Sequence, residues 1–434
     1  MEEGPGIRFI EEGFKLIDRC LDWCEKHSLY VFLDLHGAPG GQTGANIDDS
    51  IDDMPRLFMD KDSYDKGIAL WVGLAERYKD RTIVGGYDLL NEPIRTVNDK
   101  GSNIDHYLSA LSRFYKDCIK EIRKIDKNHL FSLEGHHWST RLDIFDHLFD
   151  ESMCIHFHRY WNPPEPSLLA DYIEAGKRLD VPLWLGETGE NTVEWFVTMF
   201  HMLDQHEISW NFWPWKKMAT VNSPCSIEKP ESFGTVLDYI KGGQHPGFEQ
   251  AQEIFDGYLH NMKTENCTYN DIVVKQLLRT KGCHVPALSY DTKPGIGESF
   301  SGLFKGDNEI PYRKDDKMRF IGRLRPDKET RGDNPWQEYD LLLSAGEWAD
   351  YTINASGDGT VTVCASLRPC ACGSVIEVFV NGEAAGLITV EDGKGSYLRD
   401  LCIIGSGAAT SDETITVRIK SIDGAIALET LHFS

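Results

Sequence analysis

Two glutamates follow apolar runs of the sequence in contexts that suit acid–base chemistry. Glu92 follows the run YDLL and Asn91, and Glu187 ends the run LWLGE. A carboxylic acid walled by apolar side chains has a raised pKa and can donate a proton at neutral pH. Cleavage of a glycosidic bond needs such an acid and a second carboxylate, roughly 5 Å away in enzymes that retain the anomeric configuration. Glu92 alone is equally well a solvated loop glutamate, but the pair Glu92 and Glu187 predicts the acid and the nucleophile that such cleavage needs.

A third glutamate, Glu134, is the main alternative to either of these carboxylates. It ends the apolar run LFSLE and is followed by Gly135 and by the sequence His-His-Trp, which favours a position in the wall of the site. Asn91, directly before Glu92, has the reach to hydrogen-bond a substrate hydroxyl, an interaction that can strengthen in the transition state. We therefore place Asn91 with the catalytic pair and Glu134 outside it.

Histidines and a tyrosine follow two other apolar runs. His158 and Tyr160 alternate along one predicted strand, so their side chains share a face, and a tyrosine hydroxyl there could orient a nucleophilic carboxylate. His136, His137, His156 and His158 could instead form a metal site. No carboxylate or cysteine stands at ligand spacing beside them and the HExxH pattern is absent. We therefore expect no metal ligands and no cofactor.

A glycine-rich segment and several tryptophans also follow predicted strands. His36 precedes GAPGGQTGANIDDS, whose spacing fits neither GxGxxG nor a Walker loop, so a long loop after a strand is the better interpretation. Trp213 and Trp215 alternate in WNFWPWKK, and Trp138 and Trp161 lie just past other strands. Single tryptophans are usually core residues. Their concentration at strand ends favours a floor on which sugar rings stack.

The elements that must position these residues alternate between strand and helix up to about residue 285. Apolar runs predict six strands at 30–36, 83–90, 130–135, 152–160, 182–188 and 208–215. Helical patterns lie at about 7–27, 63–79, 105–125, 167–179, 191–206 and 247–262. Buried runs alternating with helices indicate a parallel α/β sheet. The polar residues recur at the carboxyl ends of the strands, where a TIM barrel forms its active site.

Six strand–helix units are fewer than the eight of a complete (β/α)8 barrel. The chain opens with a helix at about 7–27, where such a barrel first supplies two strands. An open six-stranded sheet would carry bare edges. We therefore expect a barrel that is truncated at its N-terminus, with unusual closure as the alternative.

The sequence changes character after about residue 300. Short runs rich in Val, Ile and Thr are separated by Gly, Asn and Asp, as is typical of a β-sandwich or jelly roll. The segment before them is rich in Pro, Gly, Asp and Lys and reads as a linker or irregular lead-in. The predicted domains are thus a barrel at 1–285, a linker at 286–335 and a β-sandwich at 336–434.

Composition excludes several classes of partner. The 45 basic and 69 acidic residues give a formal net charge of −24, which disfavours nucleic acid and membrane surfaces but not neutral sugars. We see no membrane span and no signal peptide. The 11 cysteines show no disulfide or zinc pattern and suit reduced thiols. We expect a cytoplasmic protein from this chain, or a secreted one if a segment is missing at its N-terminus.

Five of these motifs together resemble glycoside hydrolase family 5. LDLHGAPGGQTG, LLNEP, HRY, LGETG and FWPWKK occur in the family's order over roughly residues 10–285. The resemblance implies a (β/α)8 fold, a retaining mechanism without metal or organic cofactor, and an oligo- or polysaccharide substrate. The family also places an Arg on strands that precede residue 1 here, which agrees with the expected truncation.

The same resemblance assigns roles to residues of this chain. It implies that Glu92 is the acid/base, Glu187 the nucleophile, Tyr160 the residue that orients the nucleophile, and Asn91 the ligand of the 2-hydroxyl. The residues it implies for the wall of the −1 subsite are His36, His158 and Trp213.

The last part of the chain resembles, more weakly, the jelly-roll carbohydrate-binding modules of families 6 and 35. EWADYTI and IALETLHF are the nearest matches, and they make Trp336 and Trp348 candidates for sugar contacts. A purely structural β-domain is equally compatible with this pattern. The expected function is hydrolysis of β-linked glucosides or glucans. Endo-β-glucanase or β-mannosidase action, a catalytically inactive carbohydrate-binding protein and an inert fragment remain the alternatives.

Overall fold

The computed structural model of the protein describes residues 7–98, 100–323, 338–355, 360–369, 373–390, 397–405 and 414–434. By its contacts the chain forms two compact units, one of residues 1–159 and 170–187 and the other of residues 160–169 and 188–434. Each unit has a hydrophobic core of its own. The division falls at 187/188 and not at the expected 285, because α6 (Val193–Gln205) packs on α9 (Asp271–Leu277) and β10 (His284–Pro286).

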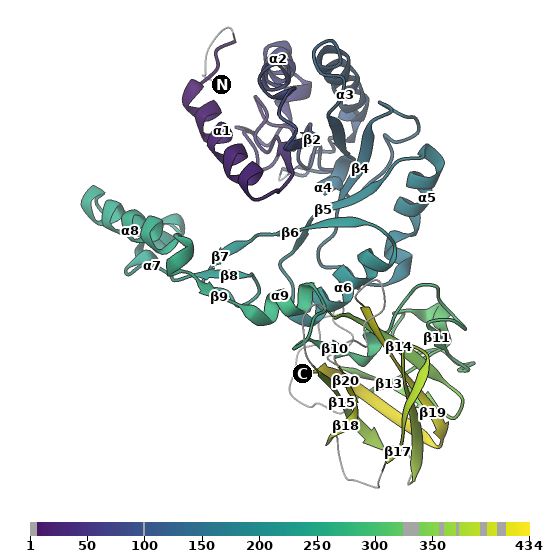
Figure 1. The fold of residues 1–434 in the computed structure, drawn as a ribbon. Helices are drawn as coiled ribbons and strands as arrows, with labels where there is room; N and C mark the ends of the chain where they lie inside the picture. Colours follow the sequence, from purple (N-terminus) through teal and green to yellow (C-terminus); the bar gives the residue numbers. More distant parts are fainter. Residues whose placement is uncertain are drawn as a thin grey trace. The chain divides into compact units, whose positions relative to one another are not determined.

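The first unit is built on a parallel sheet that forms a half-barrel (Figure 1). Its strands pair in chain order: β1 (Val31–Asp34), β2 (Val84–Asp88), β3 (Leu130–Glu134), β4 (Met153–His158) and β5 (Leu183–Gly189). Strands β2, β3 and β4 are buried at almost every position, as expected of parallel strands with both faces covered. Five of the six predicted strands are therefore confirmed here, with ends that differ by a few residues.

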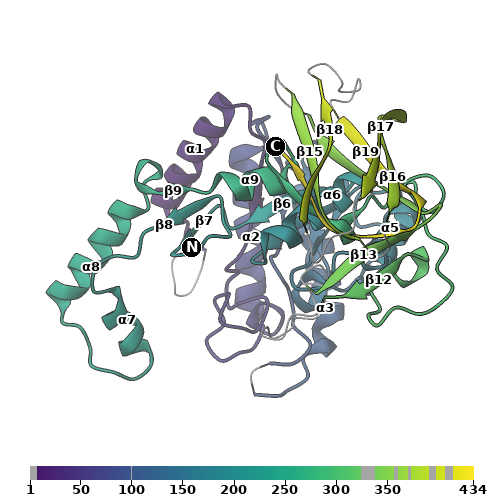
Figure 2. The same cartoon turned by 90° about the horizontal axis from the view of Figure 1, so that it is seen from below.

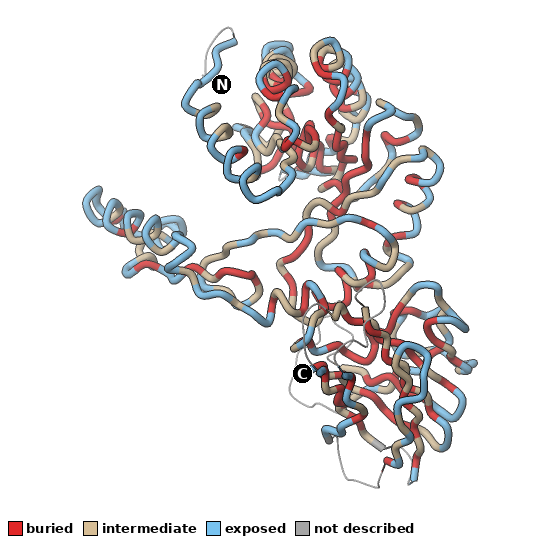
Figure 3. Tube along the Cα trace, viewed as in Figure 1, coloured by how far each residue is buried: buried red, intermediate tan, exposed pale blue. Residues whose placement is uncertain are grey.

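Helices pack on one side of this sheet and supply most of its core. They are α1 (Glu11–Lys26), α2 (Lys61–Tyr78), α3 (Leu108–Ile122) and α5 (Ala170–Leu179), with short 3-10 helices at Arg56–Phe58 and Asp105–Tyr107. The segment α4 (His136–Ser139), after β3, is a short turn with left-handed backbone from His137 to Ser139. Trp71 of α2 is fully buried, and its indole N–H donates to the carbonyl of Leu89 at 3.0 Å, which joins helix to sheet. Burial of each large apolar side chain contributes about 1.5–3 kcal/mol. Figure 3 shows that α1, by contrast, is mostly exposed.

The second unit begins with the remaining α/β elements. These are a 3-10 helix (Pro166–Leu169), α6, β6 (Ser209–Trp213), β7 (Lys216–Met218), β8 (Cys225–Ile227), α7 (Phe233–Ile240), α8 (Phe248–Asn261), β9 (Thr268–Tyr269) and α9. Strand β6 is the sixth predicted strand, and Thr192 caps α6 by accepting the N–H of Trp195. Figures 1 and 2 show α7 and α8 side by side beyond the small sheet of β7, β8 and β9.

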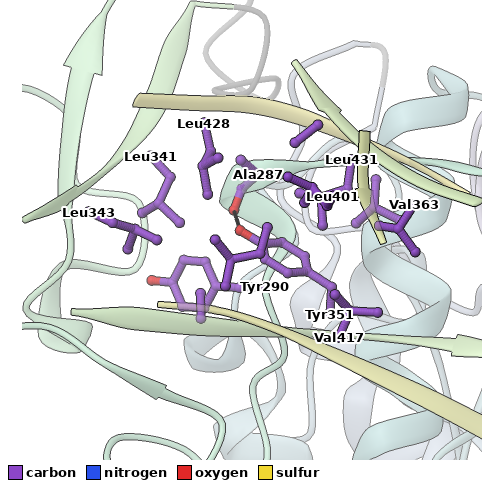
Figure 4. Packing of buried hydrophobic residues seen from close by; sticks show 14 of the residues in the cluster. Ala287, Tyr290, Leu341, Leu343, Tyr351, Val363, Leu401, Val417, Leu428 and Leu431 are labelled. Atoms are coloured by element: carbon purple, nitrogen blue, oxygen red, sulfur yellow. Dashed lines mark hydrogen bonds between the residues drawn. The ribbon is translucent and has the colours of Figure 1, made fainter. Parts of the chain in front are cut away.

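Two antiparallel sheets form the rest of the second unit. One has the order β12-β13-β20-β15-β18, with β10 also on β20, and the other the order β11-β14-β19-β16-β17. The strands are β11 (Phe300–Ser301), β12 (Arg319–Gly322), β13 (Tyr339–Ser344), β14 (Trp348–Asn354), β15 (Val361–Pro369), β16 (Ser374–Val380), β17 (Glu383–Val390), β18 (Tyr397–Ile404), β19 (Thr414–Asp423) and β20 (Ala425–Phe433). Side chains of both sheets, such as Leu428 and Val417, share one core (Figure 4). The predicted β-rich region is therefore present.

The segment expected to be a linker is instead part of this β region. The structure describes its residues 286–323, and these contribute the 3-10 helices Ala287–Ser289 and Lys314–Asp316 together with β11 and β12. Tyr290 is buried, and the guanidinium carbon of Arg313 lies 3.4 Å from the centre of its ring. The content of Pro, Gly, Asp and Lys predicted irregular backbone correctly. This irregular backbone nevertheless packs into the core, because it carries buried side chains such as Tyr290 and Arg313.

Among the described residues, helices long and apolar enough to cross a membrane are not found.

Candidate active site

Chemically active side chains gather at the carboxyl ends of the parallel strands of the first unit. Strands that run parallel end at the same edge of the sheet, so residues far apart in sequence meet there. The side chains at this edge are Asp34, His36, Asp88, Asn91, Glu92, Glu134, His156, His158 and Glu187. The edge therefore concentrates carboxylates and imidazoles, the groups that carry acid–base and nucleophilic chemistry.

The two carboxylates predicted to be catalytic lie close together. One oxygen of Glu92, one of Glu187 and one ring nitrogen of His158 all lie within 4.8 Å of one another. Nδ1 of His158 is 2.9 Å from Oε1 of Glu92 and 3.9 Å from Oε1 of Glu187. The Glu92 and Glu187 side chains are 12% and 15% exposed, whereas that of Glu134 is fully buried. Of the three glutamates, only Glu92 and Glu187 therefore reach solvent.

The backbone at Glu92 is held in an unusual conformation. Glu92 has a φ of 44°, in the left-handed region, which costs a non-glycine residue about 1–3 kcal/mol. Its N–H donates to Oε2 of Glu134 at 2.6 Å, and its carbonyl accepts from the hydroxyl of Thr43 at 2.8 Å. Since Glu134 and Thr43 are both fully buried, these two bonds fix the peptide units before and after Glu92.

A single glutamine joins the loop after β1 to the loop that carries Glu92. The side-chain amide of Gln42 donates to the carbonyls of His36 and Asn91, each at 2.9 Å, and its oxygen accepts from the N–H of Ala38 at 3.0 Å. The backbone carbonyl of Gln42 accepts from the N–H of Ile94 at 3.0 Å. The glycine-rich loop after His36 therefore holds the loop that carries Glu92 in place.

A chain of hydrogen bonds leads from Glu92 into the interior. Nδ1 of His158 contacts Glu92, and Nε2 of His158 lies 3.1 Å from Nε2 of His156. Nδ1 of His156 in turn pairs with Oδ2 of Asp88, which also accepts from the hydroxyl of Ser132 at 2.8 Å. Asp88, His156 and His158 are each 4% exposed or less, so the chain runs through the protein and away from solvent.

The buried groups of this chain have shifted pKa values. Burial, and next the charge of Asp34, raises the pKa of Asp88, and burial also raises the pKa of Glu134. Burial lowers the pKa of His156 to about 4, which keeps this ring neutral at neutral pH. Burial acts in the same direction on His158, but the charge and the hydrogen bond of Glu134 outweigh it and raise the pKa of that ring.

A carboxylate that does not stand at ligand spacing in the sequence lies beside His156 and His158 in the structure. In the register of β3 and β4, Glu134 pairs with His156, so Oε1 of Glu134 lies 3.3 Å from His156 Nδ1 and 3.4 Å from His158 Nε2. The sets of described residues close enough to hold a metal ion are Glu134 with His156 and His158, Glu92 with His158 and Glu187, and Asp34 with Asp88 and Glu134. Catalysis without a metal stays a prediction.

The other residues singled out from the sequence divide between the two units. His36 pairs with Asp34 at 2.7 Å; burial disfavours its charged form, but Asp34 raises the pKa of His36 to about 9. Asn91 is buried in the first unit, and its side-chain oxygen has no hydrogen-bond partner among the described residues. Tyr160 and Trp213 belong to the second unit, where 44% of Trp213 is exposed.

Two tryptophans of the β region, Trp336 and Trp348, were predicted to contact sugar. Trp336 lies outside the described residues. Trp348 begins β14, and the guanidinium carbon of Arg418 lies 3.4 Å from its ring centre. Asp350 accepts two hydrogen bonds from Arg418, at 2.7 and 2.8 Å, so the guanidinium is held over one face of the indole.

Sequence reasoning missed Gln42, Thr43 and Asp88, considered His156 only as a possible metal ligand, and placed Glu134 in the wall. One signal was available: Asp88, Ser132 and His156 are polar residues inside otherwise apolar strands, and such residues need partners when buried. The partner of each could not be identified, because it depends on the register of neighbouring strands.

Comparison with known proteins places the first half of the chain in a family. The family model of cellulase, glycosyl hydrolase family 5, matches residues 1–219. A "Beta-xylosidase" of Phanerodontia chrysosporium is 37% identical over 134 residues, which are 31% of this chain and 26% of that protein. A "Glucan 1,3-beta-glucosidase" of Candida oleophila is 30% identical over 160 residues, 36% of this chain and 34% of that protein.

A third relative matches the chain over a similar length. "Endoglucanase C" of Acetivibrio thermocellus is 27% identical over 157 residues, 36% of this chain and 41% of that protein. The chain thus spans less than half the length of each of these three relatives. Because the family model matches half of the 434 residues, and the strand ends carry paired glutamates and histidines, the chain belongs to glycosyl hydrolase family 5, the cellulase family.

Proposed function

We propose that this protein is a retaining β-glycoside hydrolase in which Glu92 is the acid/base and Glu187 the nucleophile. The observation that carries the proposal is the proximity of these two carboxylates, each with an oxygen within 4.8 Å of the other's. Retaining enzymes hold their carboxyl groups about 5–5.5 Å apart, whereas inverting enzymes leave about 6.5–9.5 Å for a water molecule. The short separation favours direct attack by one carboxylate on the sugar.

The proposed reaction has two steps. In the first, Glu187 attacks the anomeric carbon while Glu92 donates its proton to the departing glycosidic oxygen, and a glycosyl ester forms on Glu187. In the second, Glu92 accepts a proton from water, and the resulting hydroxide displaces Glu187 from the sugar. His158, 2.9 Å from Glu92, is placed to hydrogen-bond that carboxylate in both of its protonation states.

The remaining substrate contacts are assigned from the sequence and the geometry together. The side-chain oxygen of Asn91, buried and without a partner among the described residues, is free to accept from a sugar hydroxyl. His36 lies at the same strand edge, held by Asp34. For Tyr160 and Trp213 the roles predicted from the sequence stand as part of this proposal.

The proposed substrate is a β-linked glucoside or glucan. The relatives are named for action on xylosides, on 1,3-β-glucans and as endoglucanases, which share an equatorial β-linkage to a pyranose. The loop after His36 and its attachment through Gln42 favour a cleft closed at one end, and hence terminal cleavage. Endo-β-glucanase and β-mannosidase action are the nearest alternatives.

The proposed whole protein has a (β/α)8 barrel and a carbohydrate-binding jelly roll. The half-barrel sheet and the two antiparallel sheets among the described residues support this proposal. Sugar binding by the β region, with Trp336 and Trp348 as contacts, stays a prediction.

A panel of aryl β-glycosides, covering glucoside, xyloside and mannoside, tests the proposal. We expect hydrolysis of one sugar by the wild type and loss of turnover in Glu187→Gln, with the β-anomer as first product by NMR. The matched control is Glu190→Gln, since Glu190 lies three residues further along the chain and pairs with Lys217. A folded protein that is inert on every sugar yet binds an oligosaccharide would instead establish the binding-protein alternative.

A further inference from the structure

Two imidazole rings stand in line between the proposed acid/base and a buried aspartate. Glu92 contacts His158 Nδ1 at 2.9 Å, His158 and His156 face each other through their Nε2 atoms at 3.1 Å, and His156 Nδ1 pairs with Asp88. Only one hydrogen fits between two ring nitrogens, so one Nε2 donates while the other accepts. The protonation of each ring is therefore tied to that of its neighbour along the chain.

We propose that Asp88, His156, His158 and Glu92 form a proton relay that shares one proton between the carboxylates at its two ends. The proposal rests on the assignment of Glu92 as acid/base in the proposed function and extends it to Asp88, His156 and His158, which connect Glu92 to the interior.

The relay has two end states of equal charge. In the first, Glu92 is protonated and donates to Nδ1 of His158, Nε2–H of His158 donates to His156, and Nδ1–H of His156 donates to ionised Asp88. In the second, each of the three hydrogens has moved to its acceptor: Glu92 is ionised, both rings are again neutral, and Asp88 is protonated. O–H and N–H bonds break and form in equal number, so no other reactant is needed.

The surroundings of Asp88 favour the protonated form of its carboxyl group. Its side chain is 1% exposed, and its Oδ1 has no hydrogen-bond partner among the described residues. An ionised carboxylate with an unpartnered buried oxygen is poorly stabilised, so the neutral acid becomes accessible. The raised pKa of Asp88, caused by burial and by Asp34, agrees with this.

Between the two end states the proton rests on His158. In that arrangement the ring is an imidazolium with a carboxylate at Glu92, and Oε1 of Glu134 lies 3.4 Å from its Nε2. The charge of Glu134 therefore stabilises the midpoint of the transfer. The charged and titratable groups that act on the two rings from the surrounding elements are Asp34 of β1, Asp88 of β2, Glu92 after β2, Glu134 of β3 and Glu187 of β5. His36, after β1, acts on Asp88.

The relay would serve the two roles of Glu92. The residue must be protonated when the glycosidic bond breaks and ionised when water attacks. Through the relay, Glu92 can give its proton to Asp88 or take it back. No proton then has to be exchanged with solvent on the side of the site that the substrate fills.

A second buried aspartate–histidine pair offers a matched control. Oδ2 of Asp126 lies 2.5 Å from Nδ1 of His129 and also accepts from the hydroxyl of Tyr87 at 2.7 Å. The Asp126 side chain is fully buried, like that of Asp88, but His129 lies just before β3, at the opposite end of the strands.

The test is the ¹⁵N NMR spectrum of labelled histidines in the wild type, Asp88→Asn and Asp126→Asn. We expect Asp88→Asn to change the ring nitrogen shifts of both His156 and His158, although only His156 contacts Asp88, and Asp126→Asn to change those of His129 alone. Unchanged His158 shifts in a folded Asp88→Asn protein would overturn the relay. If Asp88→Asn does not fold, Glu92→Gln gives the same test from the other end, with His156 as the reporter.

A kinetic readout accompanies the spectra. A chain that lacks the Asp88 charge loses its remaining proton more easily, so the alkaline pKa of kcat/KM should fall by about one unit in Asp88→Asn and stay in place in Asp126→Asn. An unshifted alkaline limb in an active Asp88→Asn enzyme would also overturn the relay. Because the NMR test needs no turnover, coupled histidine shifts in an inert protein would reject the proposed function and leave the relay standing.

Discussion

The buried carboxylate of Glu134 accepts the backbone N–H of Glu92 at 2.6 Å. This bond joins a residue of β3 to the peptide unit of the proposed acid/base, whose φ of 44° is unfavourable for a side-chain-bearing residue. Glu134 is thus a positioning residue: it fixes where the Glu92 carboxylate lies and, through its charge, the protonation of His158.

Removal of the Glu134 side chain should lower kcat far more than it raises KM. In Glu134→Ala the left-handed conformation at Glu92 loses its acceptor, and a misplacement of about 1 Å can cost about 100-fold in rate. Glu134→Gln keeps an oxygen that can accept the N–H and should recover part of this loss. Steady-state kinetics on the best aryl glycoside measure both, and equal kcat values for Ala and Gln would contradict the positioning role.

Gln42 should contribute to stability as well as to the site. Gln42→Ala removes three side-chain hydrogen bonds at a fully buried position, which should lower the free energy of unfolding by about 1–3 kcal/mol. Urea denaturation measures the change. The control is Gln250→Ala, an exposed position of α8, where we expect almost no effect. A loss of the same size in both variants would show that the Gln42 bonds add nothing specific.

Stability should fall as the pH is lowered from about 6.5 to about 4. His201 is buried beside Asp291 and Arg279, and burial, then the Arg279 charge, lowers its pKa to about 4 from 6.5. The unfolded chain therefore binds a proton in this range that the folded chain does not, and each such group costs about 1.4 kcal/mol per pH unit.

His201→Gln should reduce this slope, because glutamine can donate to Asp291 without titrating. Urea unfolding at several pH values between 4 and 6.5 compares the two proteins. His156, whose pKa burial also lowers to about 4, stays in the variant and should preserve part of the slope. An unchanged pH dependence in His201→Gln would show that His201 is not one of the groups responsible.

The location of the proposed catalytic pair could be predicted from the sequence. Glu92 and Glu187 each follow an apolar run, and parallel strands bring their carboxyl ends to one edge, so the structure places both carboxylates there. The strands themselves were predictable because buried parallel strands are continuous apolar runs.

The contacts of the buried residues Glu134, Asp88 and His156 could not be predicted, for a physical reason in each case. The bond from Glu92 to Glu134 depends on a left-handed φ at Glu92, and the sequence gives no sign of this φ because glutamate rarely adopts it. The contact between Asp88 and His156 depends on how two strands that do not pair directly lie relative to each other. Residues 286–323 read as a linker because their composition reports irregular backbone and not burial.

The most direct test of the account is covalent trapping of the nucleophile. A 2-deoxy-2-fluoro β-glycosyl fluoride, matched to the sugar that the enzyme hydrolyses, slows the second step and leaves the glycosyl ester on the enzyme. Peptide mass spectrometry then identifies the labelled residue, with Glu187→Gln as control. The account predicts one label on Glu187 of the wild type and none on the variant. A label on Glu92 or Glu134, or an inverted first product without a label, would contradict it.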